Sequence, residues 1–95
     1  MDIEDNLQEI ARAVMKLRSK EEVKGFLNDI MSPKEIEHIT QRWKISKLLI
    51  ENFSFKEIER ATGASSATIS KLNQKIKYGS GEYFKILKKI LGEEH

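Results

Sequence analysis

Residues 65–77 combine side-chain types that suit contacts with nucleic acid. The stretch opens with small and hydroxyl-bearing residues, continues with lysines and a glutamine, and contains no acidic residue, although 34% of the chain is charged. Hydroxyl and amide groups can hydrogen-bond to base edges in the major groove, and lysines can meet phosphates. With a lysine shortly before it, the pattern predicts contacts with double-stranded DNA from Lys56, Ser65, Ser66, Ala67, Thr68, Ser70, Lys71, Gln74, Lys75 and Lys77.

Other residues that could do chemistry lack partners at the spacing that chemistry requires. The chain has no cysteine, and His38 is its only internal histidine, so no metal-binding set is complete. Glu57 and Glu59 are two residues apart on an expected helix and do not share a face, which makes them a poor acid–base pair. No nucleophile–base pair or phosphate-binding glycine loop is present. We therefore expect no enzymatic activity, no metal and no cofactor.

Two short helices around Gly63 would position the candidate DNA contacts. Ser54 and Glu57 form a capping-box pattern that opens the first helix, and Gly63 supplies the left-handed residue that ends it. The second helix follows Ala64 and would bury Ile69, Leu72 and Ile76. Two helices joined by a tight glycine turn predict a helix-turn-helix over residues 54–77. The position of Glu59 often holds a small residue in such motifs, so the glutamate side chain must point outward or lie near a basic side chain.

Two helices are expected before this motif. An apolar seam with spacings of four and three, Ile3, Leu7, Ile10, Val14 and Leu17, predicts a first helix suited to packing against another helix in a dimer. A second capping-box pattern at Ser19 predicts a helix from about residue 20 to residue 29. Its inward side would carry Val23, Phe26, Leu27 and Ile30.

A long central helix and a short last helix complete the expected fold. Ser32 and Pro33 form a strong start signal for a helix that should run to about Glu51 with a wide apolar stripe. A final helix from about residue 82 to residue 91 would cover the core with Tyr83, Ile86, Leu87 and Ile90, before a frayed tail at residues 92–95. The sequence thus predicts an all-α fold of about six helices in a single domain, 1–95. Its parts are dimerisation helices (1–31), a central helix (32–53), a helix-turn-helix (54–77) and a C-terminal helix (82–91).

The charge of the chain is unevenly distributed. Residues 1–37 carry six basic and nine acidic side chains, whereas residues 55–91 carry eight basic and three acidic ones. A basic half favours a polyanionic partner, although a solvated lysine-rich surface fits the charge equally well. With no long apolar run and no signal-peptide pattern, we expect a soluble, cytoplasmic protein with no membrane partner. A second copy would add the buried area that a chain of 95 residues lacks.

Residues 32–91 resemble the tryptophan repressor superfamily, and more closely its YerC/YecD branch of repressor-like proteins. The stretches that carry the resemblance are residues 31–35, 40–43, 62–70 and 78–83. The resemblance implies an intertwined homodimer whose two helix-turn-helix units contact half-sites about 34 Å apart. It also implies that the DNA-facing positions are Phe55, Lys56, Ser66, Ala67, Ser70, Gln74 and Lys77.

The resemblance also bears on a small-molecule effector. In the tryptophan repressor two arginines clamp the indole, a glycine leaves room for it, and a serine and a threonine meet its polar ends. Arg42 matches one of the arginines and Ser32 matches the threonine, so both are candidate effector-pocket residues. The other three positions differ: Lys71 stands in place of the second arginine, Leu72 in place of the glycine, and Lys75 in place of the serine. Leucine would fill the space of the ring, and lysine cannot reproduce the planar stacking of arginine. We therefore predict that tryptophan does not bind in that mode, and the identity of any effector stays open.

Three interpretations of the whole chain follow from these observations. The leading one is a sequence-specific transcriptional regulator, acting as a repressor by dimeric occupancy of an operator. A helical protein-interaction module and a nonspecific nucleic-acid binder are the alternatives. Salt dependence separates DNA binding from protein binding, and preference among DNA sequences separates the specific from the nonspecific binder.

Overall fold

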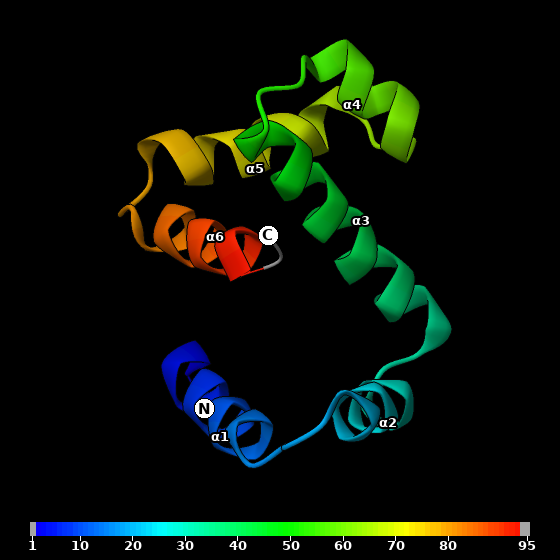
Figure 1. Ribbon diagram of the computed structural model, residues 1–95, viewed down its shortest axis with the longest axis vertical. Coiled ribbons are helices and arrows are strands. Elements are labelled where there is room, and N and C mark those ends of the chain that lie inside the picture. The colour runs from blue at the N-terminus through cyan, green and yellow to red at the C-terminus, as the bar shows by residue number, and fades with distance from the viewer. Residues whose placement is uncertain (1, 94–95) are drawn as a thin grey trace. The chain divides into compact units, whose positions relative to one another are not determined.

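The structure, a computed structural model, describes residues 2–93, and the regular elements within that range are six α-helices (Figure 1). They are α1 (Ile3–Met15), α2 (Lys20–Ile30), α3 (Pro33–Ile50), α4 (Phe55–Thr62), α5 (Ser66–Tyr78) and α6 (Glu82–Glu93). The predicted all-α fold of about six helices is confirmed. None of the helices in this range is long and apolar enough to cross a membrane.

Intrachain contacts group the helices into two compact units, with the boundary between Ile36 and Glu37 inside α3. The first unit contains α1, α2 and the first residues of α3. The second contains the rest of α3, the predicted helix-turn-helix and α6. A Ser–Pro start opens α3 as predicted: the Ser32 backbone N–H donates to Glu35 Oε1 over 2.8 Å, and the Glu35 N–H donates to Ser32 Oγ over 3.2 Å.

Helix α1 is shorter than its apolar seam. Asp2 caps its start by accepting a hydrogen bond from the Asp5 N–H, and the helix ends at Met15. Leu17, the last predicted member of the seam, therefore lies beyond the helix. The other four members are exposed by 43–75% in the single chain: Ile3, Leu7, Ile10 and Val14.

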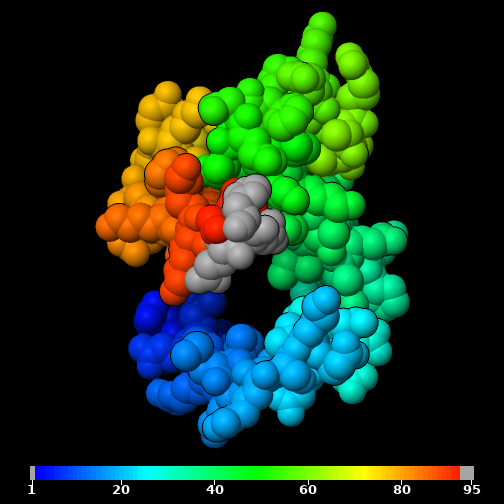
Figure 2. All heavy atoms as spheres, in the orientation of Figure 1, coloured from blue at the N-terminus to red at the C-terminus, as the bar shows by residue number. Residues whose placement is uncertain are grey.

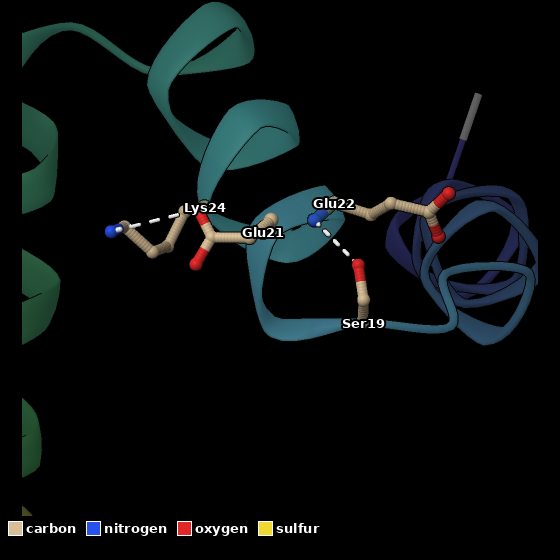
Figure 3. Close-up of polar contacts among 4 residues, drawn as sticks. All are labelled: Ser19, Glu21, Glu22 and Lys24. Atoms are coloured by element: carbon tan, nitrogen blue, oxygen red, sulfur yellow. Dashed lines mark hydrogen bonds and ion pairs between the residues drawn. The ribbon is translucent and has the colours of Figure 1, made fainter.

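Helix α2 begins at the predicted capping serine. The Glu22 N–H donates to Ser19 Oγ over 3.1 Å (Figure 3), while the Glu22 carboxylate accepts from the Arg18 N–H, one residue before the cap, over 2.7 Å. The predicted inward side of α2 is not buried in the single chain. Val23 and Leu27 are each 37% exposed, and Ile30 and Phe26 are also accessible.

The core of the second unit forms where α3, α4 and α5 meet. Its buried cluster joins one isoleucine of α3 to apolar residues of the helix-turn-helix: Ile45, Ile58, Ala64, Ile69 and Leu72. The predicted buried side of α5 is thus confirmed, since Ile76 is also buried. Beside the cluster, the fully buried Ser46 shares a 2.5 Å hydrogen bond with the hydroxyl of Tyr83, which ties α3 to α6.

Helix α6 contacts the core with only part of the predicted set: Leu87 and Tyr83 pack inward as expected, but Ile86 and Ile90 do not. Leu87 and Leu91 are buried, whereas Ile86 and Ile90 are 52% and 39% exposed. Tyr83, Leu87 and Leu91 follow one another at intervals of four, so they form one stripe on the helix, and the two isoleucines lie on an adjacent stripe. In the space-filling view the orange-red α6 lies against the end of α5 (Figure 2). The expected frayed tail is helical to Glu93, and its last two residues lie outside the described range.

Candidate nucleic-acid interface

The start of α4 is fixed by a complete capping box. The Ser54 N–H donates to Glu57 Oε1 over 2.9 Å, and the Glu57 N–H donates to Ser54 Oγ over 3.2 Å. The hydrogen bond from the Ser54 backbone, then that from its hydroxyl, lowers the pKa of Glu57 below its ordinary value of 4.5, and nearby Arg60 lowers it further. These bonds hold the first helix of the motif at a defined starting residue.

The turn between α4 and α5 depends on glycine. Gly63 has a φ of 72°, in the left-handed region, and its N–H donates to the Glu59 carbonyl over 2.8 Å. Glu59 itself is exposed, one of the two outcomes predicted for it. The turn therefore ends α4 and redirects the chain into α5 within a few residues.

Thr62 and Gln41 hold this turn from either side. The Thr62 hydroxyl donates to the Ile58 carbonyl over 2.7 Å and accepts from the Ala64 N–H over 3.2 Å. From α3, the Gln41 side-chain amide donates to the Thr62 carbonyl over 3.2 Å. This role of Gln41 was not predicted, because a polar residue 21 positions from its partner shows no local pattern.

The first residues of α5 combine capping with exposure. Ser65 is the N-cap, accepting from the Thr68 N–H over 3.3 Å, and its hydroxyl lies 3.1 Å from that of Thr68. These two predicted DNA contacts therefore already bond to each other. Ser66 and Ala67, next to them on the first turn, are exposed.

The predicted DNA contacts are exposed or half-buried residues of the helix-turn-helix. Thr68 and Ser70 are half-buried, and the other predicted contacts are exposed: Lys56, Ser65, Ser66, Ala67, Lys71, Gln74, Lys75 and Lys77. The opposite side of α5 is occupied by the buried Ile69, Leu72 and Ile76. Nothing in the described chain covers the outer side, so it is available to a partner.

A groove of about 570 Å³ runs along α5 and reaches Arg42 on α3. Its lining comprises Arg42, Thr68, Lys71, Leu72, Gln74, Lys75, Tyr78 and Gly79. Three of these side chains are cationic and none is acidic. The other candidate effector residue, Ser32, has its hydroxyl engaged at the start of α3, where it accepts from the Glu35 N–H.

Leu72 has two roles in this region. It lines the groove, and it is 7% exposed as a member of the buried cluster beneath α5. An indole at this position would need the space that the leucine side chain occupies, and moving that side chain would open the core.

The chain is similar to known proteins over most of its length and not only at the helix-turn-helix. The family model for the Trp repressor protein matches residues 5–91. The uncharacterized protein YerC of Bacillus subtilis strain 168 is 31% identical over 84 residues, which is 88% of this chain and 81% of YerC.

Two solved structures resemble the chain over nearly its whole length. A TrpR-like protein from Eubacterium eligens is 31% identical with a TM-score of 0.80, and the match covers 93% of this chain and 90% of that one. A protein from Staphylococcus aureus, described as a candidate Trp repressor, is 30% identical with a TM-score of 0.81, over 96% of this chain and 95% of that one. The predicted resemblance is thus confirmed, and the chain belongs to the Trp repressor family.

Proposed function

We propose that the protein is a transcriptional regulator that binds specific double-stranded DNA sequences as a homodimer and represses by occupying an operator. The observation that carries the proposal is the outer side of α5, which is accessible, free of carboxylates and supported from behind by a buried apolar side. Such a helix can enter the major groove with its first turns and meet phosphates with its lysines.

The distribution of side-chain types along the motif supports this proposal, because residues suited to base edges and residues suited to phosphates lie at different positions. Ser66, Ala67 and Ser70 have short side chains that allow close approach to base edges, and Gln74 carries an amide suited to adenine. Lys56 on α4 and Lys77 at the end of α5 lie to either side of them in the sequence and are exposed. Lysines in such positions set the register of a protein on DNA without selecting sequence.

Exposed apolar side chains of α1 support the homodimer. Neither α1 nor α2 contains a buried residue, yet α1 carries the seam Ile3, Leu7, Ile10 and Val14. Apolar side chains spaced at four and three along a helix are stabilised when another helix covers them. In the proposed dimer a second copy supplies that cover, and the pair presents two helix-turn-helix units to two half-sites.

The proposed regulator does not use tryptophan as its effector. Leu72 occupies the space that an indole would need, and Lys71 cannot stack on a ring as arginine does. We expect L-tryptophan to leave both the melting temperature and the calorimetric baseline unchanged. A clear rise in melting temperature on adding it would contradict this part of the proposal.

Selection of bound sequences from a random DNA pool tests the proposal. A dimeric regulator should enrich two inverted half-sites whose centres are one helical turn apart. The association constant for the enriched site should fall linearly with salt on logarithmic axes, with a slope of about −0.9 for each phosphate contacted.

Each alternative predicts a different result in these two measurements. A nonspecific binder would show the salt slope but enrich no sequence. A protein-interaction module would enrich nothing and show no DNA binding at low salt. Either result would overturn the proposed function.

A further inference from the structure

We propose that the groove along α5 binds a small organic phosphate, which competes with DNA and so releases the regulator from its operator. The inference deepens the proposed function, because it names the class of effector. It starts from three cationic side chains on two helices: Arg42 comes from α3, and Lys71 and Lys75 come from α5.

These three cations have no acidic partner within residues 2–93. The ion pairs of this part of the chain join Lys24 to Glu21 and Lys85 to Glu82, and neither pair involves the groove. Cations gathered in a concave site without carboxylates favour an anion with several charges. Phosphate suits them, since arginine can bind two of its oxygens at once and lysine adds point charges.

The size and lining of the groove favour a phosphate attached to an organic group. A volume of about 570 Å³ lies within the range of small-molecule sites and is much larger than one phosphate requires. Leu72 gives the groove an apolar surface, and Tyr78, a residue that is 81% exposed, contributes an aromatic ring. Thr68 and Gln74 add hydrogen-bonding groups. This lining matches a ligand with a phosphorylated end and a flat or apolar end, such as a nucleotide.

Competition with DNA follows from shared residues. Thr68, Lys71, Gln74 and Lys75 line the groove and are also proposed DNA contacts. A bound organic phosphate would neutralise two of the lysines and place negative charge beside the DNA backbone. Its binding and operator binding should therefore weaken each other by the same factor.

Calorimetry on the protein without DNA tests the groove by itself. The probes are inorganic pyrophosphate and ADP, with adenosine as the uncharged control and ionic strength held constant with sodium chloride. We expect saturable binding of both phosphates, tighter for ADP, one ligand per chain, and no heat from adenosine. ADP at ten times its dissociation constant should raise the melting temperature by about 5–10 °C.

A matched pair of variants on α3 identifies the site. Arg42→Gln removes a groove cation, whereas Lys44→Gln makes the same charge change at an exposed residue outside the groove. Arg42→Gln should weaken ADP binding about tenfold or more, as loss of a charge-assisted contact does, and Lys44→Gln should leave it unchanged. Absence of heat from both phosphates, or equal loss in the two variants, would overturn the inference.

A DNA arm distinguishes a free phosphate from the phosphates of DNA. ADP should lower operator affinity of the wild-type protein and have about tenfold less effect on Arg42→Gln. If that variant loses operator affinity and the wild type binds neither probe, the groove serves the DNA backbone and the inference fails, while the proposed function stands. If ADP binds but no DNA does, the proposed function fails and the phosphate site stands.

Discussion

Ser70 is the residue at which the proposed DNA contact can be tested most directly. It lies on α5 one residue after the buried Ile69 and one before the exposed Lys71, and its own side chain is half-buried. Ser70→Glu would set a carboxylate against the DNA backbone, and juxtaposed like charges cost several kcal/mol. We expect operator affinity to fall by about a hundredfold or more in a fluorescence anisotropy titration, while the circular dichroism spectrum is unchanged.

The matched control for Ser70→Glu is Thr40→Glu. Thr40 is an exposed helical residue of α3, outside the proposed DNA contacts, so it receives the same charge at a neutral position. That variant should bind DNA as the wild type does. Normal binding by Ser70→Glu would show that α5 is not the recognition helix.

The hydroxyl of Tyr83 is the hydrogen-bond partner of a buried serine. Its 2.5 Å hydrogen bond satisfies Ser46, which is fully buried in the second unit. Tyr83→Phe would leave the serine hydroxyl buried without this partner, which costs about 1–3 kcal/mol of unfolding free energy. Denaturant unfolding measures this loss. Tyr78→Phe removes the same atom from a residue that is 81% exposed and should change stability little, so equal losses would contradict the role of the buried pair.

At the scale of elements, Gly63 decides whether α4 can turn into α5. Its φ of 72° lies in the left-handed region, and no described atom lies within 4 Å of an added Cβ, so a substitution there meets strain but no clash. Gly63→Ala should lower the unfolding free energy by about 1–2 kcal/mol. Gly25→Ala, in the right-handed helix α2 with equally open surroundings, should raise it by up to about 1 kcal/mol. A stabilising Gly63→Ala would contradict the observed turn.

The capping box of α4 makes a prediction about pH. The Ser54 backbone and hydroxyl lower the pKa of Glu57 in the folded chain, so the box favours folding above the ordinary pKa of 4.5. That contribution is lost as the pH falls through the lowered pKa. In Ser54→Ala the backbone N–H remains but the hydroxyl is gone, so the pKa of Glu57 should rise part of the way to 4.5. If a side-chain NMR titration found no rise in the pKa of Glu57, it would contradict the hydrogen bond between the Ser54 hydroxyl and Glu57.

The sequence predicts the starts of elements better than the faces that they bury. Ser19, Ser32 and Ser54 each mark a helix start correctly, because a cap and its glutamate are three residues apart and interact locally. The buried face of α6 depends instead on where α3 and α5 lie. Two adjacent stripes are both apolar, so periodicity placed Ile86 in the core together with Leu87, although only Leu87 is buried.

In the candidate interface, too, the features that depend on local sequence were predicted, and those that depend on the packing of distant segments were not. Gly63 and the buried side of α5 follow local rules of turn and helix, and both are as predicted. The groove was not predicted as a shape, because it combines Arg42 with residues about 30 positions later in the chain. Only the resemblance to a known family had indicated that Arg42 belongs with Lys71 and Lys75.

At the scale of the whole molecule, the two units differ in what they bury. The second unit has a core that joins α3, α4 and α5, with Tyr83 of α6 packed against it, while α1 and α2 bury no residue in the single chain. A short chain gains stability by burying apolar surface, so helices that expose their apolar seam are stabilised by association. The seam of α1, predicted to pack in a dimer, and the side of α2 predicted to face inward are both accessible in the single chain, and the proposed second copy would cover them.

Ile10→Lys tests whether DNA binding depends on this association. Ile10 lies in the middle of the α1 seam and is 48% exposed in the single chain. In the proposed dimer it becomes buried, and a lysine there would carry an unpaired charge into an apolar contact. We expect sedimentation velocity to show a shift from dimer to monomer. Operator affinity should fall by at least about a hundredfold, because one helix-turn-helix loses the effective concentration that the other provides.

Met15→Lys separates lost association from added charge, since Met15 lies on α1 outside the seam and is 83% exposed. It adds the same lysine and should leave both the sedimentation coefficient and the operator affinity unchanged. A dimeric Ile10→Lys with normal affinity would place the dimer contact elsewhere. A monomeric Ile10→Lys with normal affinity would show that one helix-turn-helix suffices, and the homodimeric mode of binding would be wrong.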